Sequence, residues 1–201
     1  MTDPDIPQVH VVDDDAALRD SLRWLLESAG HRVATYASAE AFLASGAAER
    51  GGCLLLDIRM PGMSGLELQD QLGLHGHALP IVFITGHGDV PMAVNAVKKG
   101  ALEFIEKPCN DQTLLAAVEH ALVIDAETRH RVARFNNLTP REREVMERMV
   151  AGKRNQDIAA ELSISIKTVE AHRSGVMRKM RVDSLAALVK LVQSSGPPHR
   201  R

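Results

Sequence analysis

The chain has 201 residues, which allows one large domain or two ordinary ones, and its 45% hydrophobic and 25% charged residues exclude a disordered chain or a fibre. No apolar run approaches the roughly 20 residues that span a bilayer, and the amino terminus lacks a basic and apolar secretory signal, so we expect a cytoplasmic protein. The net charge of −2 is uneven: residues 1–124 hold 8 Lys and Arg against 17 Asp and Glu (−9), whereas residues 125–201 hold 16 against 9 (+7), which favours two domains with different partners.

The first 124 residues alternate short apolar runs with helical patterns. Runs typical of buried strands occupy Gln8–Val12, Val33–Tyr36, Cys53–Leu56, Ile81–Ile84 and Glu103–Ile105. Amphipathic segments separate these runs, and Ser64 with Glu67 can form a capping box at the start of one of them. The alternation predicts an α/β domain of (βα)5 type with a parallel sheet.

Polar side chains collect at the carboxyl ends of these predicted strands. Asp13 and Asp14 follow the first strand, Asp57 the third, Thr85 the fourth and Lys107 the fifth. Ligand sites of open parallel sheets lie at this edge, so we expect three carboxylates, a hydroxyl and an ammonium to converge there. Each residue alone could be an ordinary turn residue, but together they favour a site in which Mg²⁺ relieves the repulsion between carboxylates. One carboxylate could then attack phosphorus, while Lys107 and the metal balance the charge of the transferred group.

Four segments of this half, VVDD, LLLDIRMPGMSG, ITGHGDVPMAV and FIEKP, resemble the receiver domain of bacterial two-component response regulators, most closely the FixJ type. The resemblance covers residues 1–124 and implies that Asp57 accepts a phosphoryl group from a sensor histidine kinase. It also implies that Mg²⁺ is held by Asp13, Asp14, Asp57 and the carbonyl group of Arg59. Thr85 and Lys107 would contact the phosphoryl group, and the side chains of Arg59 and His87 would tune its loss.

The resemblance further implies a switch that ends in a dimer. Phe104 falls at the switch-aromatic position, although ordinary core packing could also explain it. The face used for dimers by related regulators corresponds here to the predicted helix Val90–Lys99 and the last strand. Its candidate residues are Val90, Met92, Val94, Val97 and Phe104. The alternative interpretation treats the apolar residues of this helix as core.

The second half contains three closely spaced helix patterns. Residues 125–137 are polar and are expected to form a helical linker; Thr139, Pro140 and Glu142 then mark a helix start by capping-box chemistry. Asn155 can cap a second helix, and a short turn leads to a third helix at Ile166–Met180. Two short helices joined by a three-residue turn are typical of a helix-turn-helix.

The third helix has an apolar and a polar face. Val169, Val176 and Met180 share one side and should pack inward. The candidate DNA contacts lie on the other side and its flanks: Lys167, Thr168, Glu170, Ala171, Arg173, Ser174, Arg178 and Lys179. Of these, Glu170, Ala171 and Ser174 are candidates for base contacts and Lys179 for a phosphate contact. A polar surface that only faces solvent would explain this distribution of residues around the helix equally well.

The sequence from LTPRERE to VMRKM resembles the LuxR-type helix-turn-helix from end to end, and the match extends over residues 138–192. It implies a DNA-binding domain at 138–201 and a fourth helix, Ser184–Gln193, that supports dimer contact on DNA. The whole chain is then expected to have two domains: a flavodoxin-like (βα)5 receiver with a parallel sheet, followed by an all-α helix-turn-helix domain.

These features predict a transcription regulator and not an enzyme. The phosphorylated homodimer would bind promoter DNA and activate transcription with RNA polymerase; the FixJ resemblance suggests nitrogen-fixation or microaerobic genes. A haloacid-dehalogenase-type phosphatase would need a second Asp where Arg59 stands, and a flavodoxin-like cofactor binder would need a phosphate-cradling loop where the acidic VVDDD lies. The main alternative is a DNA-binding transcription factor that does not depend on phosphorylation, and the acidic residues argue against it.

Overall fold

The computed structural model describes residues 7–77, 79–86 and 90–193, with the side chains of residues 90 and 91 left aside. The chain divides into two compact units, Met1–Arg129 and His130–Arg201. Each unit has its own hydrophobic core. Within the described ranges, no helix is long and apolar enough to cross a membrane.

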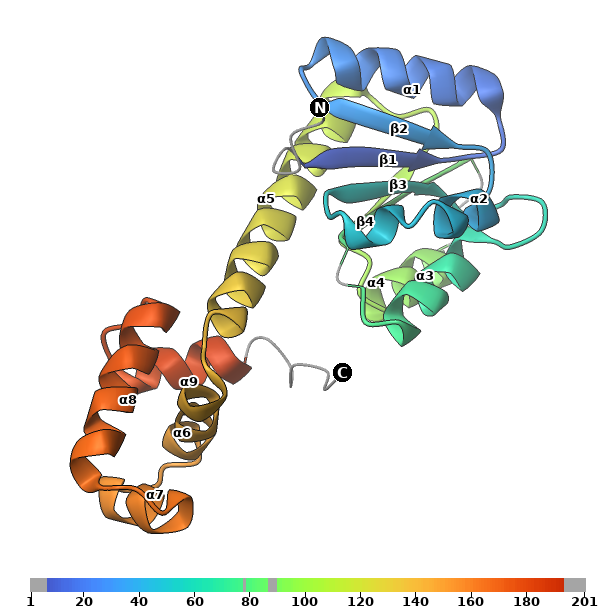
Figure 1. Ribbon diagram of the computed structural model, residues 1–201. Helices are drawn as coiled ribbons and strands as arrows, with labels where there is room; N and C mark the ends of the chain where they lie inside the picture. Colours follow the sequence, from blue (N-terminus) through green and yellow to red (C-terminus); the bar gives the residue numbers. More distant parts are fainter. Residues whose placement is uncertain (1–6, 78, 87–89, 194–201) are drawn as a thin grey trace. The chain divides into compact units, whose positions relative to one another are not determined.

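The described part of the first unit is built on a parallel sheet of five strands in the order β2-β1-β3-β4-β5 (Figure 1). The strands are β1 Gln8–Val12, β2 Arg32–Tyr36, β3 Cys53–Asp57, β4 Ile81–Thr85 and β5 Glu103–Glu106. All neighbouring strands pair in parallel, which confirms the predicted (βα)5 architecture. The strands differ from the prediction by one residue at one end of β2, β3, β4 and β5.

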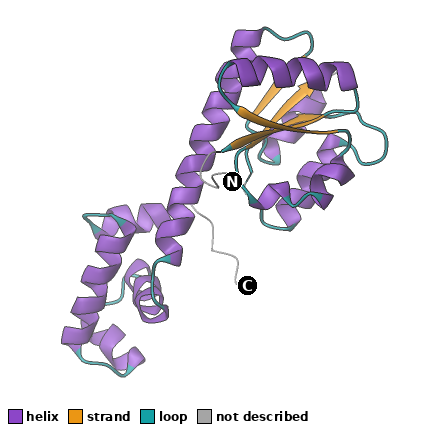
Figure 2. Cartoon of the chain, turned by 45° about the horizontal axis from the view of Figure 1, so that its top comes forward, coloured by secondary structure: helices purple, strands orange, loops and turns teal. Residues whose placement is uncertain are grey.

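Helices cover both faces of this sheet, as the cartoon in Figure 2 makes plain. They are α1 Ala16–Ser28, α2 Ala39–Ala44, α3 Gly65–Leu74, α4 Val90–Lys98 and α5 Asp111–Asn136, with a short 3₁₀ helix at Ala47–Glu49. Side chains of β3 alternate between the two faces: Leu54 and Leu56 pack with α2, α3 and α4, whereas Leu55 packs with α1 and α5. The sheet is therefore buried on both sides, and its carboxyl edge is left for a site.

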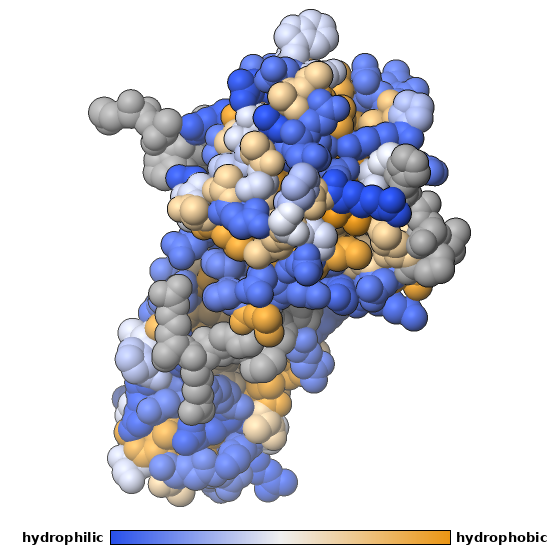
Figure 3. All heavy atoms as spheres, turned by 90° about the vertical axis from the view of Figure 1, so that its right-hand side faces the viewer, coloured by the Kyte–Doolittle hydropathy of each residue, from blue (hydrophilic) through white to orange (hydrophobic). Residues whose placement is uncertain are grey.

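Local sequence signals explain several helix ends. The predicted capping box is present: the Glu67 carboxylate accepts from the Ser64 N–H at 2.8 Å, and Ser64 Oγ accepts from the Glu67 N–H at 3.3 Å. On the face drawn in Figure 3, hydrophilic residues alternate with groups of apolar residues. On α1, the large Trp24 side chain is 74% exposed.

The described part of the second unit is all-helical. It contains the end of α5 and α6 Pro140–Val150, α7 Asn155–Leu162, α8 Ile166–Met180 and α9 Leu185–Gln193. Val145, Met146 and Met149 are buried in its core, as predicted. The predicted linker, residues 125–137, lies in α5 up to Asn136, and its status as a separate linker stays a prediction.

The helix-turn-helix differs from the prediction at one cap. Arg154 is the N-cap of α7, and Asn155 is its first residue. The Asp157 carboxylate, inside the first turn, accepts from the Arg154 N–H at 3.3 Å. The helix thus starts without a side-chain oxygen at the cap position. Ser163 ends α7 with φ 53°, and Ser165 begins α8 by accepting from the Thr168 N–H at 3.0 Å.

Candidate functional site

A lysine joins two carboxylates at the carboxyl edge of the sheet. Lys107 Nζ lies 2.8 Å from Asp13 Oδ2 and 2.8 Å from Asp57 Oδ1. The two aspartates are only 3% and 7% exposed. Because β1, β3 and β5 are parallel, their ends bring Lys107 to two aspartates that lie 50 and 94 positions before it in the chain.

The remaining oxygens of both carboxylates bind backbone donors. Asp13 Oδ1 accepts from the Asp15 N–H, and Asp57 Oδ2 accepts from the Arg59 N–H, both at 2.8 Å. Asp15 in turn caps α1 by accepting from the Ala17 N–H at 2.9 Å. Each oxygen of the pair therefore has a donor, and the strand ends hold both side chains in defined positions.

Burial and charge act against each other in this cluster. Burial raises the pKa of Asp57, while the hydrogen bond and the charge of Lys107 lower it and the nearby Asp13 raises it. Burial alone would lower the pKa of the Lys107 ammonium, but its contacts with both aspartates outweigh burial and raise that pKa. The arrangement keeps a basic carboxylate beside a fixed positive charge, which suits a nucleophile that receives an anionic group.

The predicted three-carboxylate metal cluster is not assembled. Asp14 is exposed, and the part of the chain that the structure describes has no group of three His, Cys, Asp or Glu side chains placed for a metal ion. Asp13 and Asp14 both follow β1, but only the Asp13 side chain is buried with Asp57 and Lys107. The donors still fit Mg²⁺, which usually keeps several waters and takes one or two carboxylates. Asp13 and Asp57 supply two, and their contacts with the Lys107 ammonium show that the two carboxylates are placed to share one positive charge.

Thr85 and Phe104 lie next to the cluster along the sheet. Thr85 is buried at the end of β4, and its carbonyl oxygen accepts from the Lys107 N–H at 2.8 Å. Phe104 is half-buried on β5, with its ring centroid 6.5 Å from that of Phe83. Core packing and a switch position are both compatible with this placement, so the role of Phe104 stays a prediction.

Three residues that hold this site were missed by the sequence analysis. Glu40 Oε1 accepts from the Met63 N–H at 2.8 Å and so ties α2 to the loop after Asp57. Arg19 Nη1 donates to the Asp13 carbonyl oxygen at 2.7 Å. Gly65 has no room for a side chain, because a Cβ there would lie 2.2 Å from the Asp57 carbonyl oxygen. Only the glycine was visible as a signal, as the end of the MPGMSG turn.

The α8 helix has the two faces that its sequence predicts. Val169, Val176 and Met180 are fully buried, which confirms the inward face. Lys167, Glu170, Ala171, Ser174 and Arg178 are exposed, whereas Thr168, Arg173 and Lys179 are half-buried. The exposed residues form a continuous stripe from the start of the helix, where a recognition helix would meet base edges.

Lys179 differs from its predicted setting on this helix. Its Nζ lies 2.6 Å from Glu142 Oε2, on a carboxylate that is only 7% exposed. The hydrogen bond from Lys179 is the main reason that the pKa of Glu142 is lowered to about 2. Lys179 was expected to be available for a DNA phosphate, but here it pairs with a carboxylate on α6.

Known proteins match the chain in two parts. Residues 9–119 match the response regulator receiver domain, and residues 136–192 match the luxR family of bacterial regulatory proteins. The chain is 46% identical over 200 residues to the transcriptional regulatory protein FixJ of Azorhizobium caulinodans, which covers 96% of this chain and 95% of the relative. The chain belongs to the FixJ-type response regulators. It is also 39% identical to the tetrathionate response regulatory protein TtrR of Salmonella typhimurium, over 96% of this chain and 95% of that one.

Solved structures agree with this membership of the response regulators. The response regulator StyR matches with a TM-score of 0.61 at 48% identity, over 94% of this chain and 99% of that one. Full-length FixJ from B. japonicum matches with a TM-score of 0.56 at 44% identity, over 94% and 97%. The receiver match over residues 9–119 fits a regulator better than the phosphatase and cofactor-binding alternatives.

The predicted dimer face of this response regulator is only partly apolar surface. Val94 and Val97 are 46% and 51% exposed, so they are not core residues. Met92 is half-buried against the core, and the side chain of Val90 and the residue His87 lie outside the described part. Whether this face forms a dimer stays a prediction.

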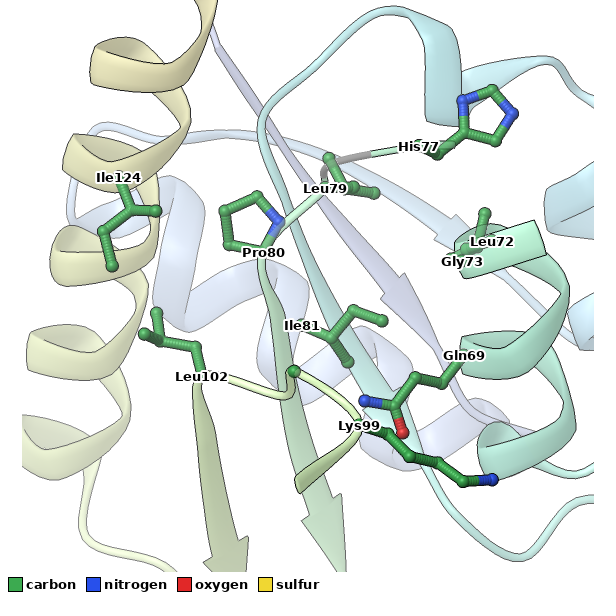
Figure 4. Close-up of a pocket in the computed structure, with 11 residues that line it drawn as sticks. Gln69, Leu72, Gly73, His77, Leu79, Pro80, Ile81, Lys99, Leu102 and Ile124 are labelled. Carbon is green, nitrogen blue, oxygen red and sulfur yellow. The ribbon is translucent and has the colours of Figure 1, made fainter. Parts of the chain in front are cut away.

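A cavity of about 230 Å³ lies at the opposite edge of the receiver sheet (Figure 4). Gln69 on α3, Lys99 after α4 and Ile124 on α5 line it together with the start of β4. The Gln69 amide donates to the Ala96 carbonyl oxygen at 3.0 Å. None of the predicted site residues lines this cavity, so it is separate from the aspartate–lysine cluster of the response regulator.

Proposed function

We propose that this response regulator is switched by phosphorylation of Asp57, and that its phosphorylated form binds promoter DNA through α8 and activates transcription. The observation that carries the proposal is the buried pair Asp13 and Asp57 with Lys107 Nζ 2.8 Å from each. A nucleophile, a fixed cation and donors for Mg²⁺ meet at the edge where parallel sheets bind ligands.

The chemistry follows from these side chains. An Asp57 carboxylate oxygen forms a bond to phosphorus while the bond between phosphorus and the kinase histidine nitrogen breaks. Lys107 stabilises the negative charge of the transferred group, and the Thr85 hydroxyl donates a hydrogen bond to the product. Mg²⁺, when held by Asp13 and Asp57 with the Arg59 carbonyl group and with Asp14 nearby, would neutralise further charge on the phosphoryl oxygens.

The proposal extends to assembly, location and targets. The phosphorylated protein forms a homodimer through α4 and β5 and contacts RNA polymerase at promoters in the cytoplasm. The similarity to FixJ suggests nitrogen-fixation or microaerobic genes, but the name of TtrR shows that relatives of equal length respond to other signals. Selection of genomic DNA by the phosphorylated protein would identify the regulated promoters.

Labelling tests the site. Acetyl phosphate with Mg²⁺ should add one phosphoryl group to the full chain, and intact-mass measurement should show no addition to Asp57→Asn. Asp70→Asn is the matched control, because Asp70 is an exposed aspartate that pairs with Lys99 on the surface. Equal labelling of the wild type and Asp57→Asn would overturn the assignment of the phosphoacceptor. Chelation of Mg²⁺ should abolish labelling.

DNA binding tests the switch. After treatment with acetyl phosphate, the wild type should bind the selected DNA more tightly than Asp57→Asn does. If both proteins bind it equally, the alternative of a phosphorylation-independent transcription factor is correct.

A further inference from the structure

The last turn of α8 is tied to the first turn of α6 by a partly buried ion pair. Lys179 Nζ lies 2.6 Å from Glu142 Oε2. The Glu142 side chain is 9% exposed and the Lys179 side chain 29%. Because the carboxylate has little access to water, loss of its cation would leave a charge that solvent cannot stabilise well.

Glu142 is held in place from several directions. Its Oε2 also accepts from the Thr139 N–H at 2.8 Å, which completes the capping box of α6. On the α8 side, a Cβ at Gly175 would come within 2.6 Å of Glu142 Oε1, so this carboxylate occupies the space that the glycine leaves. The side chain is therefore wedged between the two helices, and its position depends on both.

This contact restrains α8 in a way that apolar packing does not. Val176 and Met180 bury the inner face of the helix, but such contacts are not directional. The hydrogen bond from Lys179 has a direction, and it limits rotation of α8 about its axis and sliding along α6. A second polar contact acts on the same turn, because Arg134 Nη1 donates to the Met180 carbonyl oxygen at 3.4 Å.

We propose that Glu142, acting through Lys179, is a positioning residue for DNA sequence recognition, and that Lys179 does not neutralise a DNA phosphate. The inference rests on the proposed function, in which the exposed stripe of α8 meets DNA. An ammonium bound to a buried carboxylate is not available to a phosphate, whereas Lys167, exposed near the start of the same helix, is. Rotation of α8 would displace the base-reading residues and lower sequence preference.

Salt dependence separates the two roles of a lysine. The full chain, treated with acetyl phosphate and Mg²⁺, is titrated with a random-sequence DNA duplex at several salt concentrations. Lys167→Met should lower the slope of log affinity against log salt by about 0.9, the value for one lost phosphate contact. Lys179→Met should leave the slope unchanged. An equal drop in the slope for both variants would overturn the inference.

Sequence preference tests positioning. The measured quantity is the affinity for the best sequence selected by the wild type, divided by the affinity for the random duplex. Lys179→Met should lower this ratio roughly tenfold, comparable to the cost of one mismatched base pair. Lys179→Arg should restore it, because a guanidinium can donate to Glu142. Thr139→Ala is the matched control, since it removes half of the capping box and keeps the lysine contact.

The double variant Glu142→Gln/Lys179→Met controls for misfolding of the single variant. It removes both charges, so no ionised group is left buried, and its ratio should fall no further than that of Lys179→Met alone. A ratio unchanged in Lys179→Met, or unchanged in a folded double variant, would overturn the inference. If the wild type selects no DNA sequence, the proposed function fails and the inference falls with it. If the wild type selects a sequence and the variants prefer it to the same degree, the inference alone fails.

Discussion

Gly65 shapes the loop after Asp57 because it lacks a side chain. Its N–H donates to the Ile58 carbonyl oxygen at 2.9 Å, which brings the start of α3 against the end of β3. A Cβ would lie 2.2 Å from the carbonyl oxygen of Asp57, closer than atoms of these types approach each other. The obstacle is backbone and not a flexible side chain, so the loop would have to move.

Gly65→Ala should therefore impair both stability and phosphorylation. We expect the free energy of unfolding to fall by more than about 1 kcal/mol. Acetyl phosphate should label Asp57 roughly tenfold more slowly, because the nucleophile is displaced. Gly73→Ala, in the same helix, is the control: apart from its chain neighbours and the backbone of its own helix, no described atom lies within 4 Å of its Cβ position, and alanine should stabilise by up to about 1 kcal/mol. Denaturant titration and labelling rates distinguish the two; similar behaviour would contradict the steric argument.

At the scale of single residues, the side chains that follow the strands were the easiest site residues to predict from the sequence. Asp57 and Lys107 could be placed together because the ends of parallel strands share one edge. The bond from the Met63 N–H to Glu40 could not be predicted, since any residue carries such a donor and the partner is 23 positions away. Lys179 was assigned to a DNA phosphate, because nothing in the local pattern marks a buried carboxylate 37 positions earlier.

At the scale of elements, the turn between α7 and α8 contains a strained residue. Ser163 has φ 53° and ψ 45°, and its N–H binds carbonyl groups of the last turn of α7. This left-handed conformation costs a residue with a Cβ roughly 1 kcal/mol, and glycine adopts it readily. The serine hydroxyl is not needed for the cap, which uses the backbone.

Ser163→Gly should accordingly stabilise the DNA-binding unit by up to about 1 kcal/mol. Ser165→Ala, two residues later, should destabilise it by about 1 kcal/mol, because Ser165 Oγ accepts from the Thr168 N–H at the start of α8. Thermal unfolding of both variants would show the opposite signs. Destabilisation by Ser163→Gly would mean that the turn gains more from the restricted backbone of serine than it loses to strain.

Elements with strong local signals were predicted to the residue. The bounds of α8 follow from the cap Ser165 and from the spacing of its buried face, and both lie within the helix itself. The predicted cap of α7 was wrong: the hydrogen bond at the start of this helix comes from Asp157, inside the first turn, and not from Asn155. The polar residues 125–137 were expected to form a helical extension or linker, and the structure has one continuous helix from Asp111 to Asn136.

Across the whole molecule, the two units should respond differently to acid. His10 is fully buried in the first unit, against the rings of Tyr36 and Phe42, with Nε2 3.2 Å from the Gly51 carbonyl oxygen. Burial lowers the pKa of His10 below its usual 6.5; the hydrogen bond to Gly51 opposes this, Arg50 adds to it, and Asp125 opposes it. In the second unit, the Lys179 contact lowers the pKa of Glu142 from 4.5 to about 2.

The signs of these shifts predict the order of acid unfolding. Below pH 6.5 the unfolded chain takes up a proton at His10 that the folded receiver resists, so receiver stability should fall by up to about 1.4 kcal/mol per pH unit. The contribution of Glu142 is complete above pH 4.5 and is lost between there and about 2. Hydrogen exchange should thus show loss of protection in the receiver first. His10→Asn should remove the early loss, while His120→Asn, at an exposed histidine, should not; simultaneous loss in both units would contradict the assignment.

Assembly is the second property of the whole chain that can be tested. Light scattering should show a monomer without phosphorylation and a dimer after treatment with acetyl phosphate. Val94→Asp and Val97→Asp should prevent the dimer, because a charge buried in an apolar contact is unfavourable. Val123→Asp, at an exposed valine on α5, is the matched control. A mass that does not change on phosphorylation, or a dimer in all three variants, would refute the α4 face.

The exposed Trp24 determines how such experiments can be followed optically. It is the one tryptophan of the sequence, and its indole is already 74% in water in the folded protein. Emission from an indole so exposed should change little when either unit unfolds, so a flat fluorescence trace would not indicate a stable protein. Circular dichroism is the better probe of unfolding. The same exposure makes Trp24 a useful probe of binding. A blue shift of its emission would indicate that a partner has covered the outer surface of α1.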